Sequence, residues 1–347
     1  MKKHILSSVA LAVTATTLNP FPADACSRIV YHGTENLYIV GRSLDWKTPI
    51  PTNIYVFPRG VKRQSSDQPG AKKWVSKYGT VCAVGYDGGI TEGMNEKGLV
   101  INGLFCKGTI YNRPDKPQKS PMSLAVFVAW LLDLNETTDQ VVAALKKGDF
   151  SIGGATFDGG TVSTLHWGIT DASGKTAILE YNNGEMKIYD AGDVWTLTND
   201  PQWPDMLAIN AYWNKIGGVN MLPGTVKSSD RFVRGEFFVH HVESVSDADL
   251  GVSIAKSVLM NCCVPYFYTP IDEPNVSSTQ WTSYANLRDK RYYFQLTTNP
   301  GLYYIDMNTL LLTVGSPVLK LETEKVGNLA GCANKQLKKS APFNPMY

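Results

Sequence analysis

The sequence predicts an α+β fold in which antiparallel sheets are covered by helices. Strand-like and helix-like segments come in groups along the chain, in the order strands, helices, strands, helices, strands. They do not alternate singly, as they would around a parallel sheet. The dipeptide Asn183-Gly184 between two strand-like runs is a second observation, because Asn-Gly is typical of tight antiparallel hairpins.

The predicted strands are short runs of alternating or apolar residues bounded by turn residues. In chain order they are residues 27–31, 37–42, 81–86, 99–105, 164–170, 175–181, 186–189, 194–198, 283–287, 291–297 and 302–306. A turn rich in Gly and Asn is expected at residues 93–98.

The predicted helices are recognised by their start and stop signals. Ser120 as N-cap and Pro121 in the first turn predict a helix that continues to residue 134. The capping box at residues 137–140 predicts a second helix, which ends at about residue 147. Three further helices are predicted at residues 207–216, 229–242 and 247–259.

The first predicted hairpin brings candidate catalytic residues together. Its two strands flank the polar turn at residues 32–36. Pairing across this turn places Cys26 opposite about Ser43. Arg42 and Asp45 are therefore expected close to the Cys26 thiol.

The N-terminal segment has the features of a secretory signal. It begins with two lysines, continues with an apolar stretch at residues 5–18 and ends in Ala23-Asp24-Ala25. A signal peptidase would cleave after the second alanine. The sequence therefore predicts a signal peptide over residues 1–25, a single domain over residues 26–347 and a periplasmic or secreted protein.

Cleavage there would give Cys26 a free α-amino group. An α-amine titrates near ~8 in model peptides, so it can accept the thiol proton at neutral pH. That is the chemistry of an N-terminal-nucleophile hydrolase. Two alternatives remain: an incidental cysteine in an exported binding protein, and a lipoprotein whose first cysteine is acylated. Ala23 stands where lipoprotein signals usually carry an aliphatic residue.

Composition excludes several classes of function. The formal net charge of +2 over 347 residues argues against nucleic acid as the main partner. No apolar run after the signal is long enough to span a bilayer. The six cysteines form no CxxC pair, no HExxH motif occurs, and the glycine-rich stretch at residues 153–160 lacks a phosphate-loop ending. We therefore expect no metal and no cofactor.

Four residues besides Cys26 are candidates for the chemistry of a cysteine hydrolase. Arg42 is a cation that would favour the thiolate, and Asp45 would orient the amine. Asn199, at the corner after a predicted strand, could donate to an oxyanion, and Arg231 lies on a predicted helix. Each also has an ordinary structural interpretation as a turn, cap or surface residue.

The alternative arrangement is a Cys/His pair of the papain kind. His166 lies on a predicted strand, and His240-His241 end a predicted helix, where an imidazolium interacts favourably with the helix dipole. No cysteine has a papain-like sequence neighbourhood.

Five motifs resemble the choloylglycine hydrolase family. They are Cys26-Ser27-Arg28, Gly41-Arg42-Ser43-Leu44-Asp45-Trp46, Gly93-Met94-Asn95-Glu96-Lys97-Gly98-Leu99, Leu197-Thr198-Asn199-Asp200-Pro201 and Asp230-Arg231-Phe232-Val233-Arg234. The resemblance covers nearly all of residues 26–347. It implies an αββα sandwich, a homotetramer and cleavage of a linear, non-peptide amide.

The resemblance also implies a role for each candidate. Cys26 is the nucleophile and its own amine the base, Arg42 and Asp45 support it, Asn199 donates to the oxyanion, and Arg231 organises the site. Phe105 stands where many bile salt hydrolases carry Asn, and the stretch between Asn199 and Arg231 is short. Both features resemble the penicillin V acylases of Gram-negative bacteria.

The expected substrate is a small acyl amide. Trp46 and Phe105 are candidates for an apolar acyl pocket, although ordinary core packing would also explain them. An aromatic pocket would favour phenoxyacetyl or fatty-acyl groups. Penicillin V-like amides and N-acyl homoserine lactones are therefore the expected substrates, with conjugated bile salts as the alternative.

Overall fold

The structure is a computed structural model that describes residues 26–113, 115, 119–153, 156–157, 161–268 and 277–347. The predicted signal peptide at residues 1–25 lies outside the described residues, as does part of the glycine-rich stretch at residues 153–160.

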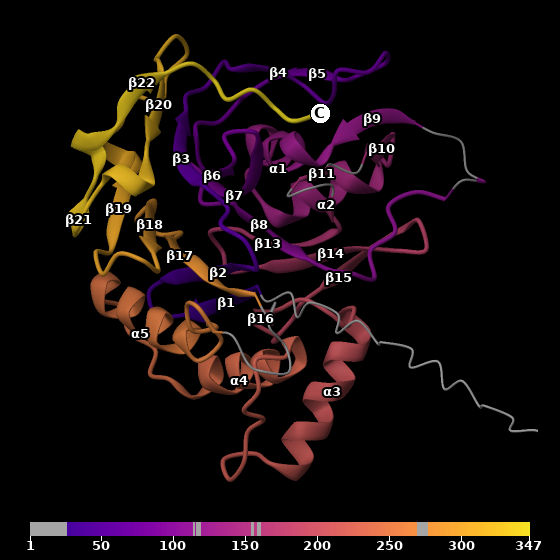
Figure 1. The fold of residues 1–347 in the computed structure, drawn as a ribbon, viewed down its shortest axis with the longest axis vertical. Coiled ribbons are helices and arrows are strands. Elements are labelled where there is room, and N and C mark those ends of the chain that lie inside the picture. Colours follow the sequence, from indigo (N-terminus) through magenta and orange to yellow (C-terminus); the bar gives the residue numbers. More distant parts are fainter. Residues whose placement is uncertain (1–25, 114, 116–118, 154–155, 158–160, 269–276) are drawn as a thin grey trace, which may run out of the picture.

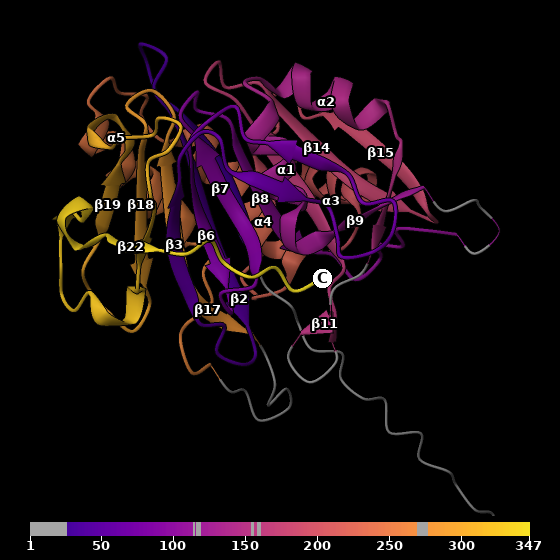
Figure 2. The same cartoon turned by 90° about the horizontal axis from the view of Figure 1, so that it is seen from above.

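Two large sheets face each other at the centre, and helices cover both outer faces (Figures 1 and 2). Within the described residues the sheets have nine and seven strands, paired mainly antiparallel. The layers therefore run helix, sheet, sheet, helix. The predicted α+β class is confirmed, and the fold is an αββα sandwich.

The seven-stranded sheet follows directly on Cys26. In spatial order its strands are β16 (Thr196–Leu197), β1 (Ser27–His32), β2 (Tyr38–Trp46), β17 (Ser278–Asn286), β18 (Arg291–Leu296), β19 (Tyr303–Asp306) and β21 (Gly331–Cys332).

The nine-stranded sheet lies on the other side of the central core. In spatial order its strands are β15 (Glu185–Asp190), β14 (Thr176–Asn182), β13 (Leu165–Thr170), β8 (Val100–Phe105), β7 (Gly89–Asn95), β6 (Thr80–Gly85), β3 (Thr52–Phe57), β20 (Val318–Leu321) and β22 (Lys338–Ser340). Three small ribbons pair β4 (Lys62–Gln64) with β5 (Lys73–Val75), β9 (Ser120–Ser123) with β10 (Phe150–Gly153), and β11 (Thr156–Phe157) with β12 (Thr161–Val162).

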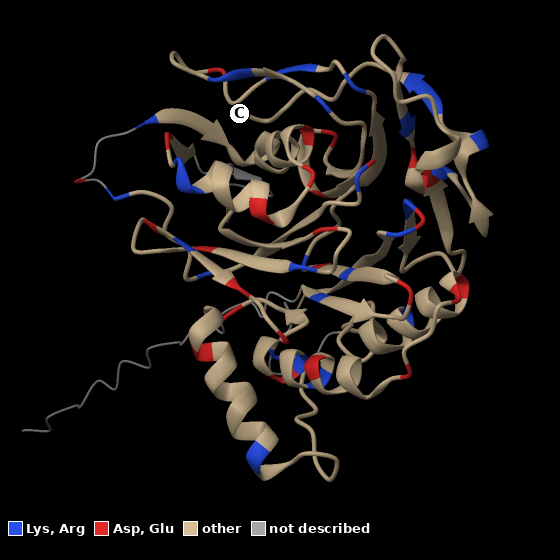
Figure 3. Ribbon diagram, turned by 180° about the vertical axis from the view of Figure 1, so that it is seen from behind, with Lys and Arg blue, Asp and Glu red and all other residues tan. Residues whose placement is uncertain are grey.

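The helices form the two outer layers. The nine-stranded sheet is covered by α1 (Leu124–Leu134) and α2 (Thr138–Lys146). The seven-stranded sheet is covered by α4 (Ser228–His241) and α5 (Ala248–Met260), and α3 (Trp203–Ile216) packs on α4. Short 3₁₀ helices are η1 (Met307–Thr309), η2 (Thr323–Lys325) and η3 (Asn334–Gln336). Among the helices described, none has the length and apolarity needed to cross a bilayer. Basic and acidic residues are interspersed over most elements (Figure 3).

The central strands are buried on both faces, because each sheet lies between the other sheet and a helical layer. In β1, Val30 packs into the core between the sheets with Met94. Its neighbours Ile29 and Tyr31 point the other way and pack with Val252 of α5. This alternation follows from the two-residue period of a strand.

The predicted β1–β2 hairpin is confirmed, with its register shifted by one residue. Ser27, not Cys26, lies opposite Ser43. The turn contains two consecutive residues at positive φ, Glu35 (53°) and Asn36 (57°), and the turn geometry sets which residues pair. Cys26 therefore lies just beyond the last pair of the hairpin.

The predicted start of the first helix is wrong. The segment at Ser120 and Pro121 is strand β9, which pairs in parallel with β10. Helix α1 begins at Leu124, and Ser123 is its N-cap, with Oγ accepting from the Ala125 amide at 3.2 Å. A serine after the proline thus supplies the cap.

The turn predicted at residues 93–98 is wrong in its first half. Gly93, Met94 and Asn95 belong to β7, and the turn begins at Glu96. Gly93 serves close packing here, because a Cβ at this position would lie 2.7 Å from Cys82 Sγ.

Candidate active site

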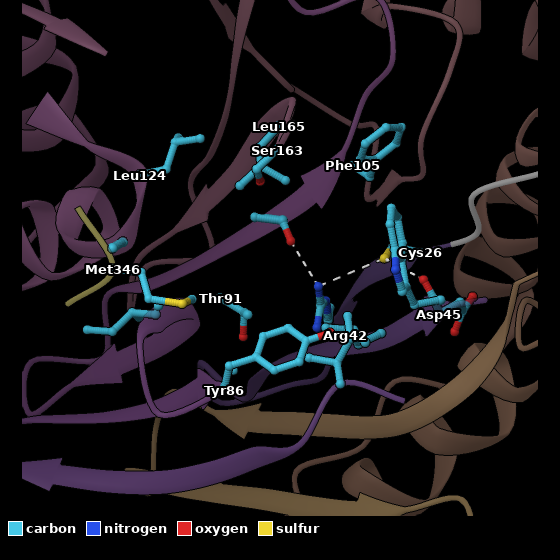
Figure 4. A pocket seen from close by; sticks show the side chains of 18 residues that line it. Cys26, Arg42, Asp45, Tyr86, Thr91, Phe105, Leu124, Ser163, Leu165 and Met346 are labelled. Carbon is cyan, nitrogen blue, oxygen red and sulfur yellow. Dashed lines mark hydrogen bonds between the residues drawn. The ribbon is translucent and has the colours of Figure 1, made fainter. Parts of the chain in front are cut away.

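Cys26 lies immediately before β1 and is only 4% exposed. Its Sγ accepts a hydrogen bond from Arg42 Nη2 at 3.9 Å and donates to the Asp45 carbonyl at 3.8 Å (Figure 4). Both neighbours come from β2, the strand that the hairpin places alongside. The predicted proximity of Arg42 and Asp45 to the thiol is therefore observed.

The electrostatic environment of the thiol combines burial with a nearby cation. Burial raises the pKa of the Cys26 thiol, and the Arg42 guanidinium opposes that rise. A thiol in this state needs a proton acceptor before it can act as a nucleophile.

Arg42 is held on several sides. Its Nε lies 3.3 Å from Glu92 Oε2, its Nη2 donates to the Gly103 carbonyl at 2.9 Å, and its guanidinium carbon lies 4.6 Å from the centre of the Trp281 ring. The arginine is 2% exposed and Glu92 is fully buried. The guanidinium is therefore positioned by residues of both sheets.

Asp45 is a fully buried carboxylate. Its Oδ2 accepts from Ser43 Oγ at 3.3 Å. Burial raises the pKa of Asp45 to about 6, although the charges of Arg231 and Arg42 act to lower it. This carboxyl group therefore changes charge in the weakly acidic range.

Asn199 and Arg231 contact the backbone of Cys26. The Cys26 nitrogen donates to Asn199 Oδ1 at 2.6 Å, and Arg231 Nη2 donates to the same oxygen at 2.8 Å. Asn199 Nδ2 donates to the Phe105 carbonyl at 2.7 Å. Arg231 Nη1 also donates to the Cys26 carbonyl and to Ser27 Oγ, each at 2.6 Å. The two residues thus hold the backbone of Cys26 in place.

An apolar pocket opens beside the thiol, with a volume of about 120 Å³. Trp46 and Phe105 line it, as predicted, with ring centres 5.4 Å apart. The remaining wall is formed by Cys26, Arg42, Leu44, Asp45, Ile50, Gly85, Tyr86, Gly89, Ile90, Thr91, Gly103, Leu124, Ala125, Ser163, Leu165 and Met346.

The candidate histidines of the described residues lie outside this pocket. His166 is fully buried, with Nε2 2.6 Å from the Thr198 carbonyl and Nδ1 3.0 Å from Glu180 Oε1. His240 bonds Glu236 at 2.9 Å and stacks on Trp195. Neither lines the pocket of Cys26.

Cys106, His166 and Glu180 form a cluster whose ligand atoms lie within 4.8 Å of one another, a spacing at which such groups could hold a metal. Hydrogen bonds already occupy each group. Cys106 Sγ donates to Asp200 Oδ1 at 3.8 Å, and both Glu180 oxygens accept from the Trp203 amide at 3.0 Å. These bonds account for the cluster as a buried network.

Sequence reasoning missed Glu92, Trp281 and Met346. The motif 93–99 pointed to the segment next to Glu92, but its assignment as a turn hid the fact that Glu92 is a strand residue facing the other sheet. No local pattern marks Trp281 or Met346, because each reaches the site only through long-range packing.

Comparison with known proteins defines the class. Residues 26–320 match the family model described as linear amide C–N hydrolases, choloylglycine hydrolase family. The chain therefore belongs to the choloylglycine hydrolase family and is a hydrolase of linear amide C–N bonds, as the five motifs implied.

Two of the similar proteins are penicillin V acylases. The one from Pectobacterium atrosepticum is 33% identical over 330 residues, covering 89% of this chain and 88% of that protein. The solved structure of the one from Agrobacterium tumefaciens has a TM-score of 0.85 at 38% identity, covering 92% of this chain and 99% of the other. A bile salt hydrolase/transferase from Clostridium perfringens is 26% identical over 309 residues, 82% of this chain and 92% of that protein. The resemblance to the penicillin V acylase branch is confirmed.

Proposed function

We propose that the chain is cleaved before Cys26 and that the new N-terminal cysteine hydrolyses amides with an apolar acyl group. One observation carries the proposal: Cys26 Sγ lies on the wall of an apolar pocket, between Arg42 and the backbone held by Asn199. The family match that begins at residue 26 supports the cleavage position.

The proposed first step is acylation. The α-amine of Cys26 accepts the Sγ proton, and Sγ forms a bond to the amide carbonyl carbon. The C–N bond then breaks, and the amine product leaves with that proton. Water hydrolyses the resulting thioester, which releases the carboxylic acid and restores the thiol. Arg42 stabilises the thiolate from 3.9 Å.

Asn199 is suited to bind the oxyanion formed in both steps. Its Oδ1 accepts two hydrogen bonds, so the amide orientation is determined by its partners. Among the described residues, one Nδ2 hydrogen is used, by the Phe105 carbonyl. The other is available to a developing negative charge.

Pocket size favours phenoxyacetyl amides such as penicillin V. An apolar cavity of about 150 Å³ holds one benzene ring, and the pocket here measures about 120 Å³. One aromatic ring therefore takes up all of this space, and a steroid nucleus is larger than the pocket. The penicillin V acylase relatives support the same choice.

The test is a hydrolysis panel with penicillin V, N-acyl homoserine lactones and glyco- and tauro-conjugated bile salts. We expect penicillin V to be hydrolysed fastest and Cys26→Ala to be inactive on every substrate. A thioester trapped by acid quench should appear in the intact mass at Cys26. Undiminished turnover by Cys26→Ala would overturn the mechanism, and faster bile salt turnover would support the alternative substrate.

We further propose a periplasmic or secreted homotetramer. The intact mass of the purified protein tests the processing, since it should correspond to residues 26–347 with an unmodified Cys26. A diacylglyceryl adduct would instead indicate a lipid-anchored binding protein. Light scattering of the processed protein tests the oligomeric state.

A further inference from the structure

Met346 lines the same pocket as Cys26, although most of the chain separates them. In the close view the two side chains lie at opposite ends of the pocket (Figure 4). The segment that carries Met346 ends beside β9 and α1 in both overall views (Figures 1 and 2). A segment from the far end of the chain therefore forms the wall most remote from the thiol.

Hydrogen bonds hold this segment against the pocket. The Met346 amide donates to the Gly88 carbonyl at 2.9 Å, and Ser123 Oγ donates to the Met346 carbonyl at 3.4 Å. The Tyr347 hydroxyl donates to the Gln64 carbonyl at 3.3 Å. The Met346 backbone is therefore attached both to the β6–β7 turn and to the start of α1.

An aromatic anchor precedes Met346. Phe343 is 6% exposed, and its ring centre lies 6.1 Å from that of Tyr55 and 5.9 Å from that of Phe57. These contacts bury the ring in the core under α1. A buried aromatic side chain contributes strongly to packing stability, because it removes a large apolar area from water. The Phe343 ring therefore holds the C-terminal segment in a defined position.

The Met346 side chain rests directly on Gly88. A Cβ at residue 88 would lie 2.5 Å from Met346 Cγ and 2.9 Å from its Sδ. The absence of a side chain at Gly88 thus makes the space that Met346 occupies. The methionine is 38% exposed, so its outer part is not locked into the core. Its unbranched side chain has three rotatable bonds and adapts to irregular spaces.

We propose that Met346 sets the depth of the acyl pocket and so limits the length of the acyl group that reaches Cys26. This inference rests on the proposed function. Groups as large as one ring fit in front of Met346. Longer chains fit only when its side chain moves aside, at a cost in affinity and rate. Met346 is therefore a specificity-determining residue.

The test compares Met346→Ala and Met346→Phe with the wild type on amides of a single amine. The acyl groups run from butanoyl to dodecanoyl, with phenoxyacetyl included. Because one methylene in an apolar pocket changes kcat/KM by about 10-fold or more, we expect Met346→Ala to raise the dodecanoyl-to-butanoyl ratio by at least that factor. Met346→Phe should lower the ratio by a similar factor.

Met260→Ala is the matched control. Met260 is also a partly exposed methionine, 54% exposed at the end of α5, and it does not line the pocket. We expect it to leave the ratio unchanged. A wild-type ratio in both Met346 variants, with Cys26→Ala inactive, would overturn this inference and leave the proposed function intact.

A second readout does not depend on turnover. Calorimetry measures the affinity for free carboxylic acids, from butanoic acid up to dodecanoic acid. The proteins compared are Cys26→Ala and the two double variants that combine it with Met346→Ala or Met346→Phe. The expected shift in chain-length preference has the same direction as in the kinetics. If the wild type hydrolyses none of the amides, the proposed function fails, and unchanged acid binding would then overturn the role of Met346 as well.

Discussion

The Asn199 amide has its two ends assigned by its neighbours. Arg231 can only donate, and it shares Oδ1 with the Cys26 N–H, whereas the Phe105 carbonyl can only accept, so it binds Nδ2. An aspartate at this position would keep the acceptor next to Arg231 and lose the donor. The residue therefore offers a way to separate positioning from oxyanion binding.

We predict that Asn199→Asp lowers kcat for penicillin V by about 10²–10³-fold, the loss typical of one oxyanion donor. The carboxylate can still accept from Arg231, but the oxygen that replaces Nδ2 faces the Phe105 carbonyl without a hydrogen bond, so the melting temperature should fall moderately while the variant stays folded. Steady-state kinetics measure the effect. Asn308→Asp, an exposed change, is the control with wild-type kcat. A variant with near-normal kcat would contradict the assignment of Asn199.

Asp45 leads us to predict a loss of activity at weakly acidic pH. Burial raises its pKa to about 6, so the carboxylate becomes protonated as the pH falls through that value, and the negative charge that interacts with Arg231 and Arg42 beside the thiol is lost. kcat/KM should decline below about pH 6. Asp45→Asn should lower kcat/KM by about 10²-fold or more and remove the part of the decline centred near pH 6, while protonation of the α-amine still lowers activity on the acid side.

Stability should change in the opposite direction. A carboxyl group with a raised pKa in the folded state binds its proton more tightly there than in the unfolded chain. Asp45 therefore costs stability as the pH rises from its ordinary value of 3.8 through about 6. If unfolding instead paralleled the loss of activity below pH 6, the acidic decline would report denaturation and not Asp45.

At the scale of elements, Glu92 on β7 links the two sheets. Besides the ion pair with Arg42, its Oε1 accepts from Ser283 Oγ and from the Tyr292 hydroxyl, each at 2.5 Å. These three partners lie on β2, β17 and β18 of the other sheet. A single carboxylate thus satisfies polar groups from three strands in the core between the sheets.

We predict that Glu92→Gln lowers the free energy of unfolding by about 3–5 kcal/mol, because it leaves the Arg42 charge buried without its counterion. Urea denaturation measures the change. Glu322→Gln is the control, since its partner Lys325 is 73% exposed and such a pair contributes about 0–1 kcal/mol. Equal effects of the two substitutions would show that the buried pair is not a structural link.

His166 joins β13 to β14 through Glu180 and to the Thr198 carbonyl next to Asn199. Burial acts to lower the pKa of His166, but Cys106 and Glu180 outweigh it and raise the pKa to about 10. The contribution of protonated His166 to the free energy of unfolding is therefore fully present below the ordinary pKa of 6.5. It is lost as the pH rises through the folded-state pKa of about 10. The difference in unfolding free energy between the wild type and His166→Gln should therefore shrink from pH 6 to pH 10. A difference that stays constant over this range would contradict the raised pKa.

At the scale of the whole molecule, the candidate site is formed by segments that are far apart in the sequence. Cys26 immediately precedes β1 of the seven-stranded sheet, Phe105 ends β8 of the nine-stranded sheet, and Met346 comes from the C-terminal segment. The proposed cleavage before Cys26 would free the nitrogen that donates to Asn199 Oδ1.

We therefore predict that a cleavage-blocking substitution, Ala25→Trp, yields folded but inactive protein. The Cys26 nitrogen stays an amide and cannot accept the thiol proton, so turnover should fall by about 10²-fold or more. Circular dichroism and penicillin V hydrolysis of the unprocessed chain, confirmed by intact mass, measure both properties. Full activity in a chain that retains residue 25 would rule out the amine as the base.

The sequence by itself determined the fold class, the β1–β2 hairpin with Arg42 and Asp45 near Cys26, and, through the family motifs, Asn199 and Arg231. These features depend on local periodicity, turn residues and the chemistry of single residues, which involve only neighbours in the sequence. The sequence did not predict β3, β7 or β20, and the predicted start of α1 was wrong, because these segments depend on partners far away in the sequence.

Only the tertiary structure decided that Glu92 and Trp281 hold Arg42, which end of the Asn199 amide faces Cys26, and that Met346 closes the pocket. Those features arise from packing between the two sheets and the C-terminal segment, and no local pattern encodes such contacts.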